Sequence, residues 1–166
     1  SNIAGSSINI VNATITNAAD GVASLAVGNT ISFTNAIVTN TRPAIYLTGA
    51  TVSANATWPK IGNAAYVLDN DIGVATGATL TIAPGVVVKG EYSQYPDSRL
   101  EISGRLLAQG TADQPIVFTS LRDDTAGGDS NNDASASSPA NGDWGGLYFE
   151  NSANSSLDYV IVRYGG

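Results

Sequence analysis

A short alternating pattern recurs along the chain: an apolar residue, any residue, another apolar residue, then a polar residue and Asn or Gly. Its clearest copies begin at Ile8, Ile31, Ile45, Tyr66, Leu80, Leu100 and Leu147. Each copy predicts a short β-strand whose alternate side chains point to one face, closed by a residue that tolerates a bend. A degenerate repeat of this kind is typical of a solenoid, in which each unit buries its apolar face only against its neighbours.

The spacing of the copies favours a parallel β-helix. Ile31 and Ile45 are 14 residues apart, whereas Ile45 and Tyr66 are 21 apart, which predicts turns with more than one strand and corners of unequal length. No helical periodicity persists. The alternative is a sandwich or jelly roll, which would carry Asn-Gly or Asp-Gly hairpin turns, and these are scarce. We therefore expect an all-β fold, one β-solenoid domain over residues 1–166, with about six to seven turns.

Residues 121–142 interrupt this rhythm. The segment is rich in Asp, Asn, Ser and Gly and has no apolar periodicity, so it is predicted to be a long loop inserted at one corner of the solenoid. Loops that project from a solenoid often carry its binding surface.

Composition narrows the function classes. Charged residues make up 13% of the chain, about half the usual share, and the net charge is −7. The seven Lys and Arg residues are scattered, which argues against nucleic acid or an anionic membrane as partner, and no apolar run approaches the roughly 20 residues that membrane insertion needs. Cys and His are absent, so disulfides and the commonest general base are excluded. A polar but mostly uncharged surface is typical of extracellular β-proteins, and we expect an extracellular or cell-surface location.

Four stretches of the chain resemble successive turns of bacterial secreted and cell-surface right-handed parallel β-helix repeat proteins, namely 74–90, 100–120, 142–149 and 157–166. The second stretch carries a G-x-L-x-A-x-G-T core at Gly104, Leu106, Ala108, Gly110 and Thr111. The resemblance covers most of the chain from about Trp58 onward. It implies the right-handed parallel β-helix fold. Because that group consists mostly of large repetitive proteins without an assigned reaction, some of them adhesin-like, it implies no particular activity.

Acidic side chains crowd the 121–142 loop and suggest a calcium site. Ca²⁺ takes six to eight oxygen ligands, and Asp129, Asn131 and Asp133 match the first positions of a calcium-binding loop. The loop is not an EF-hand, because Ala134 stands where Gly is required. A corner site and a solvated, flexible loop both remain open, and we expect the like charges to repel unless a cation orders them. The expected ligands are Asp123, Asp124, Asp129, Asn131, Asp133 and Asp143.

Two other sets of residues allow alternative functions. A sugar-binding platform would use Trp58, Trp144, Tyr92, Tyr95 and Tyr148. Alternation places Tyr148 outward, whereas Trp144 is expected to pack at the base of the loop. A polysaccharide lyase would need a basic residue beside a calcium-bound uronate, and Lys89, Arg99 or Arg105 could serve, although ion pairs stacked on an outer face explain these charges equally well.

The two ends of the chain show no capping pattern, although an open solenoid turn exposes unpaired backbone and apolar interior. The strand that begins at Leu157 is followed almost at once by the last residue, and joining the last residues to the first continues the strand pattern. We therefore expect the last turn of one copy to stack head to tail on the first turn of the next. The 166 residues would be one repeat or segment of a longer array, or a subunit that polymerises into a filament. The expected junction residues are Ile8, Ile10, Val160 and Ile161.

These observations favour a structural, non-enzymatic extracellular protein whose solenoid stacks end to end into a filament or stalk. The first alternative is an adhesin module that binds surface glycans through the 121–142 loop. The second is a Ca²⁺-dependent polysaccharide lyase.

Overall fold

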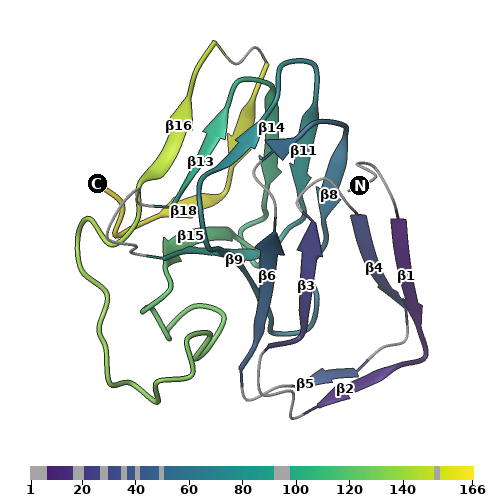
Figure 1. Cartoon of the computed structure of the whole chain (residues 1–166), viewed down its shortest axis with the longest axis vertical. Helices are drawn as coiled ribbons and strands as arrows, with labels where there is room; N and C mark the ends of the chain where they lie inside the picture. The colour runs from purple at the N-terminus through teal and green to yellow at the C-terminus, as the bar shows by residue number, and fades with distance from the viewer. Residues whose placement is uncertain are drawn as a thin grey trace.

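The computed structural model describes residues 7–16, 21–26, 30–34, 37–39, 42–48, 51–91, 98–151 and 154–166. Within these ranges every regular element is a β-strand, and all strand pairs are parallel (Figure 1). The predicted parallel β-helix is confirmed. In the same ranges there is no helix with the length and apolar character needed to span a membrane.

The described strands form six turns of three strands each. Turns 1 and 2 comprise β1 (Ser7–Val11), β2 (Thr14–Thr16), β3 (Ala23–Ala26), β4 (Thr30–Thr34), β5 (Ile37–Thr39) and β6 (Ala44–Thr48). Turns 3 and 4 comprise β7 (Thr51–Val52), β8 (Ala56–Trp58), β9 (Ala65–Leu68), β10 (Ile72–Val74), β11 (Thr79–Ile82) and β12 (Val87–Gly90). Turns 5 and 6 comprise β13 (Arg99–Ile102), β14 (Arg105–Gln109), β15 (Ile116–Ser120), β16 (Gly146–Phe149), β17 (Ser156–Asp158) and β18 (Val160–Val162).

One sheet runs through all six turns, in the order β18-β15-β12-β9-β6-β3, and we call it the long sheet. The other two sides of turns 3 to 6 are the four-stranded sheets β16-β13-β10-β7 and β17-β14-β11-β8. In turns 1 and 2 the corresponding strands form two separate pairs, β1-β4 and β2-β5. Among the described strands, therefore, only the long sheet continues from turn 2 to turn 3, and β4 lies against β8 without joining its sheet (Figure 1).

The core is built from inward-facing ladders of apolar side chains. In β11, for example, Leu80 and Ile82 point inward and pair in register with Leu106 and Ala108 of β14, and all four are buried. The intervening residues of β11 are threonines that lie on the outer side. This period-two alternation is the pattern that predicts the strands from sequence.

The long sheet departs from that alternation because both of its faces are covered. All four residues of β9 are buried, although only Tyr66 and Leu68 belong to the main core. Val67 belongs to a second apolar cluster on the outer face, together with Ala44 and Leu121. Since Leu121 opens the 121–142 segment, that segment covers the outer face of the sheet, as parallel sheets generally require.

The last turn differs from the sequence prediction at one point. The pattern from Leu157 onward predicts one strand, but the structure has two strands, β17 and β18, that join different sheets. Tyr159 separates them with a φ of 46°, and its carbonyl accepts a hydrogen bond from the amide of Ile116. A sharp corner therefore replaces the predicted continuous strand.

Candidate functional site

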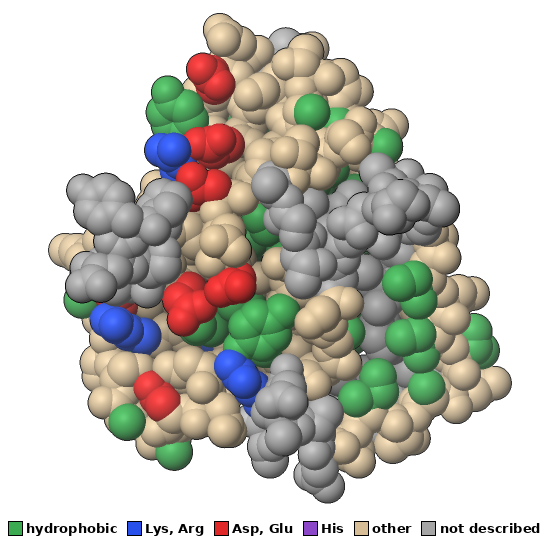
Figure 2. All heavy atoms as spheres, in the orientation of Figure 1, with side chains coloured by type: hydrophobic (Ala, Val, Ile, Leu, Met, Phe, Trp, Pro, Cys, Tyr) green, Lys and Arg blue, Asp and Glu red, His purple; other side chains and the backbone are tan. Residues whose placement is uncertain are grey.

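The most unusual feature of the outer surface is the long loop of residues 121–142, which we call the acidic loop. It leaves the solenoid after β15 and returns before β16, at one corner of turn 5 (Figure 1). On the view in Figure 2, charged side chains gather over the half that contains this loop, β13 and β16, whereas the half over β1 and β4 displays apolar and uncharged ones among the coloured side chains. The charged side chains that could bind a ligand or a metal therefore concentrate on the acidic loop and the sheet face beneath it (Figure 2).

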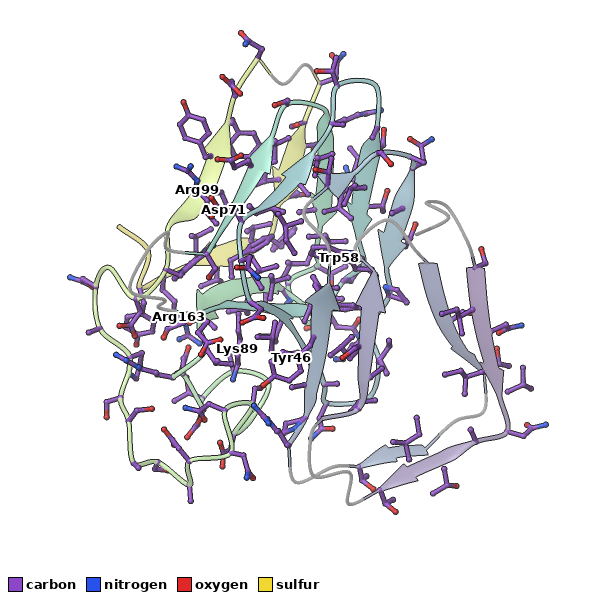
Figure 3. All side chains as sticks on the ribbon, viewed as in Figure 1. Tyr46, Trp58, Asp71, Lys89, Arg99 and Arg163 are labelled. Carbon is purple, nitrogen blue, oxygen red and sulfur yellow. The ribbon has the colours of Figure 1, made fainter. Side chains whose placement is uncertain are left out.

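A ladder of outward-facing side chains on the long sheet lies beneath this loop. Adjacent strands place Tyr46, Val67, Lys89 and Thr119 in register, and we call them the outer ladder. Lys89 is completely buried, and its Nζ donates a hydrogen bond to the carbonyl of Gly128 at 2.6 Å. Lys89, Tyr46 and Arg163 lie on the same side of the sheet, facing the loop (Figure 3).

Burial dominates the protonation behaviour of Lys89. Loss of water lowers the pKa of its ammonium to about 8, although the nearby carboxylates of Asp124, Asp123 and Asp129 act in the opposite direction. Arg163 lowers the pKa further through charge repulsion. At neutral pH, Lys89 is therefore a buried cation held among acidic side chains.

Asp123 anchors the start of the acidic loop. Its Oδ2 accepts a hydrogen bond from Thr119 at 2.6 Å and forms an ion pair with Arg163 at 2.9 Å. Its Oδ1 accepts hydrogen bonds from the amide and hydroxyl of Thr125. Burial raises the pKa of this carboxyl, but the hydrogen bonds from Thr119 and Thr125 and the charge of Arg163 outweigh it, so the pKa lies below its usual value. Asp123 is thus a charged structural anchor.

Three of the six predicted metal ligands come together. Carboxylate oxygens of Asp124, Asp129 and Asp133 all lie within 4.8 Å of one another. Burial raises the pKa of Asp124, and the neighbouring charges of Asp129 and Asp133 raise it further. The Oδ1 of Asp124 is buried without a hydrogen-bond partner. This grouping of oxygens is compatible with Ca²⁺, which stays a prediction.

The other predicted ligands lie elsewhere or bond within the loop. Asn131 donates hydrogen bonds from Nδ2 to Asp133 at 2.8 Å and to Ser137 at 3.1 Å, while its Oδ1 is buried without a partner. Asp143 lies where the loop returns to the solenoid, bonded to Ser120 at 2.7 Å and paired with Arg122 at 3.3 Å. Asp123 and Asp143 therefore hold the two ends of the acidic loop, apart from the carboxylate cluster.

Sequence reasoning missed the cations that compensate the loop. We expected its like charges to need a bound metal, but Lys89, Arg122 and Arg163 supply positive charge from the protein itself. The signal for Lys89 was present, because a lysine interrupts the otherwise apolar strand Val86-Val87-Val88 just before Gly90. Spacing alone does not reveal that a loop more than 30 residues later covers it.

A cavity of about 310 Å³ lies between the acidic loop and the corner that follows β12 and β15. Its lining is mostly polar and consists of Glu91, Ser120, Leu121, Arg122, Asn131, Asp133 and Ser137. Burial raises the pKa of Glu91, and a hydrogen bond and charge repulsion from Asp69 act in the same direction. The serines, Asp133 and Arg122 already bond to other groups of the protein.

Of the three described aromatic residues considered for a sugar platform, two are buried and one is exposed. Trp58 is buried and stacks on Tyr66, with ring centroids 5.3 Å apart. Trp144 is also buried and stacks on Phe118, and both belong to the main core inside the solenoid. Tyr148 is exposed on the outer side of β16, as its alternation predicts. Tyr92 and Tyr95 lie outside the described residues.

The basic residues considered for a lyase are engaged elsewhere. Lys89 is enclosed by the acidic loop, as described above. Arg99 pairs with Glu101 at 2.7 Å and with Asp71 at 3.5 Å (Figure 3). Arg105 donates from Nε to the carbonyl of Asn154 at 2.8 Å. Arg99 therefore takes part in the stacked ion pairs that the sequence allowed as an alternative.

The end of the solenoid formed by turn 6 is open in the described structure. Phe149, Leu157 and Val162 pair with the buried core residues Ile102, Ala108 and Phe118, so they face the solenoid interior, yet each is 41–48% exposed. Of the predicted junction residues, Val160 also faces inward and packs on the core, whereas Ile161 lies on the outer face beside Val117. At the other end, Ile10 packs against the core and Ile8 is 43% exposed.

Comparison with known proteins gives one match. A family model described as a pectate-lyase-like β-helix domain matches residues 49–158, which correspond closely to turns 3 to 6. Neither the curated proteins nor the solved structures contain a match to the chain.

Proposed function

The chain belongs to the family of pectate-lyase-like β-helix domains, and we propose that within this fold it is a structural, non-enzymatic solenoid that elongates by stacking end to end. The partner is a further β-solenoid turn, supplied by the first turn of another copy or by the next repeat of a longer array. We place the assembly outside the cell, consistent with its polar, weakly charged surface.

One observation carries this proposal: among the residues whose side chains are described, the exposed large apolar ones lie in the first strand and the last turn. They are Ile8 and Val11 of β1, then Tyr148, Phe149, Leu157, Tyr159, Ile161 and Val162 of turn 6. The strands of turns 3 to 5, whose side chains are all described, expose none. Exposed apolar side chains gathered in one part of a fold are typical of an interaction surface.

The end of turn 6 offers both kinds of contact that a further turn needs. The outer edges of β16, β17 and β18 carry backbone groups with no neighbouring strand among the described residues, so they can pair with another parallel edge. Covering Phe149, Leu157 and Val162 would extend three core ladders across the junction. Because each is roughly half exposed, its complete burial contributes about 1 kcal/mol.

Two adjacent residues of β16 provide a matched test. Phe149 faces the solenoid end, whereas Tyr148 faces outward, and both are 42–50% exposed. We expect the unmodified protein to form fibres in negative-stain electron microscopy and to sediment as a concentration-dependent polymer. The substitution Phe149→Glu should abolish both, and Tyr148→Glu should leave them intact.

The proposal fails if the unmodified protein stays a discrete short particle at every concentration. It also fails if Tyr148→Glu disperses the fibres as effectively as Phe149→Glu, because the contact would then lie on the outer face. Release of unsaturated uronates from a polysaccharide would replace the structural role with lyase activity. Specific retention in a glycan screen would replace it with the adhesin alternative.

A further inference from the structure

We infer that the acidic loop acts as a strap that holds turns 1 and 2 onto turns 3 to 6. The need for a strap arises at the junction between turns 2 and 3, where two of the three sides of the solenoid lose their strand pairing among the described residues. Among the described strands, the β6–β9 ladder of the long sheet is the one that continues there. The inference does not depend on end-to-end stacking.

The loop crosses the long sheet from turn 6 to turn 2. At its start, Asp123 binds Arg163 after β18 and Thr119 of β15. Further along, the carbonyl of Gly128 accepts the hydrogen bond of Lys89 from β12. The loop then reaches the segment before β6, where Arg42 donates to the carbonyl of Ser130 at 3.1 Å.

The part of the acidic loop around Ser130 contacts turn 2 directly. The hydroxyl of Ser130, which is buried, lies 3.3 Å from the carbonyl of Pro43, and the carbonyls of Gly127 and Gly128 in the loop lie at 3.4 Å and 3.3 Å. The same Pro43 carbonyl accepts a hydrogen bond from the amide of Ala65 in turn 3, at 2.8 Å. Thus the loop binds at the point where turn 2 meets turn 3.

Close backbone approach makes the contact tight. A Cβ placed on Gly127 would lie 3.1 Å from the Cβ of Ala65 and 3.3 Å from Cγ1 of Val87, so the loop backbone rests on turns 3 and 4, and an added side chain would have to displace these neighbours by a few tenths of an ångström. Gly127 also has a φ of +67°, which disfavours other residues. Beneath the loop, Ala44, Val67 and Leu121 form the buried outer cluster that joins turn 2 to turn 3 and to the loop itself.

The test compares two glycines of the same loop. Gly127→Val should lift the strap from the sheet, whereas Gly142→Val is the matched control, because Gly142 also has a positive φ but has nothing within 4 Å of its Cβ position. Native-state amide exchange in the full chain is followed by NMR. The informative amide is that of Ala65, which bridges turns 2 and 3, and the internal reference is the amide of Gly104, which donates to the Val74 carbonyl.

We expect Gly127→Val to accelerate exchange at Ala65 and in β6 at least tenfold, with the reference amide unchanged, and Gly142→Val to have no effect at the junction. Ser130→Ala, a milder change, should accelerate the same amides about two- to fivefold and keeps the test available if Gly127→Val does not fold. Two results would overturn the inference. In one, the loop amides of Asp133 and Ala134 exchange faster while exchange at the Ala65 amide is unchanged. In the other, exchange at the Ala65 amide and at the Gly104 reference amide accelerates equally.

Discussion

Lys89 gives the most direct quantitative test of the covered sheet face. It is a buried lysine whose pKa is lowered to about 8 from an ordinary value of 10.5. Below pH 8 the folded protein bears the cost of enclosing an ammonium. Above pH 8 the folded protein releases the proton, while the unfolded chain keeps it up to about pH 10.5. The unfolded state then binds more protons, so the free energy of unfolding rises with pH in this window.

The size of the effect follows from the two pKa values. Their separation corresponds to about 3 kcal/mol. Most of this, about 2–3 kcal/mol, should be gained between pH 7 and pH 10, because titration in the unfolded chain is nearly complete only above that range. Lys89→Met retains much of the aliphatic volume but removes the titration. It also leaves the Gly128 carbonyl without its donor, which adds an offset that does not vary with pH.

Urea unfolding of both proteins at a series of pH values from 7 to 10 isolates this contribution. Burial raises the pKa values of Tyr46 and Tyr66, which favours unfolding above pH 10, but both tyrosines are present in the two proteins and cancel in the difference. We expect the free energy of unfolding of the unmodified protein to rise by about 2–3 kcal/mol relative to that of Lys89→Met across the series. Parallel curves for the two proteins would refute the reasoning, because Lys89 would then be solvated and the acidic loop would not cover it.

Two further predictions concern the core and the carboxylate cluster. Gly90→Ala would place a Cβ 2.5 Å from the Cβ of Trp144 and should lower the free energy of unfolding in urea titrations by about 1–3 kcal/mol. The control is Gly165→Ala, whose Cβ would lie 3.5 Å from the Trp144 ring and which should change the free energy of unfolding by less than about 1 kcal/mol. Equal effects of the two substitutions would contradict the packing argument. If the three clustered carboxylates bind Ca²⁺, a concentration of about 100 times Kd should stabilise the protein by about 2.7 kcal/mol and raise the melting temperature by several degrees. Asp129→Asn should remove that shift, and a melting temperature that does not respond to Ca²⁺ or EGTA would rule out the site.

The fold was predictable because its main strands carry a local signal. The patterns at Ile45, Leu80 and Leu100 have alternate apolar residues that pair in register with apolar residues of the next turn, and periodicity detects this directly. Strands of only two or three residues, such as β7 and β10, are too short to show an alternation. Their positions follow from the neighbouring turns and not from their own sequence.

The candidate site was less predictable because it depends on contacts between distant segments. Composition identified the 121–142 loop and its acidic residues, and three of them do converge. It did not reveal that Asp123 is bonded to Thr119 and Arg163, or that Asp143 is bonded to Ser120, because those pairings arise from how the loop enters and leaves the sheet. Nor could it show that Gly127 rests on Ala65, more than 60 residues away in the chain.

The single ladder between turns 2 and 3 has a mechanical consequence. In a stalk under tension along its axis, all the remaining junctions between described turns share the load among three rows of backbone hydrogen bonds. The junction between turns 2 and 3 has a single row among the described strands. We expect extension to begin there. The acidic loop, through its contacts with Lys89 and Pro43, would carry load in parallel with the β6–β9 ladder. Rupture of that ladder would then not immediately separate turns 1 and 2 from turns 3 to 6. Such a junction would let a fibre lengthen by a limited amount before the hydrogen bonds within turns 3 to 6 are strained.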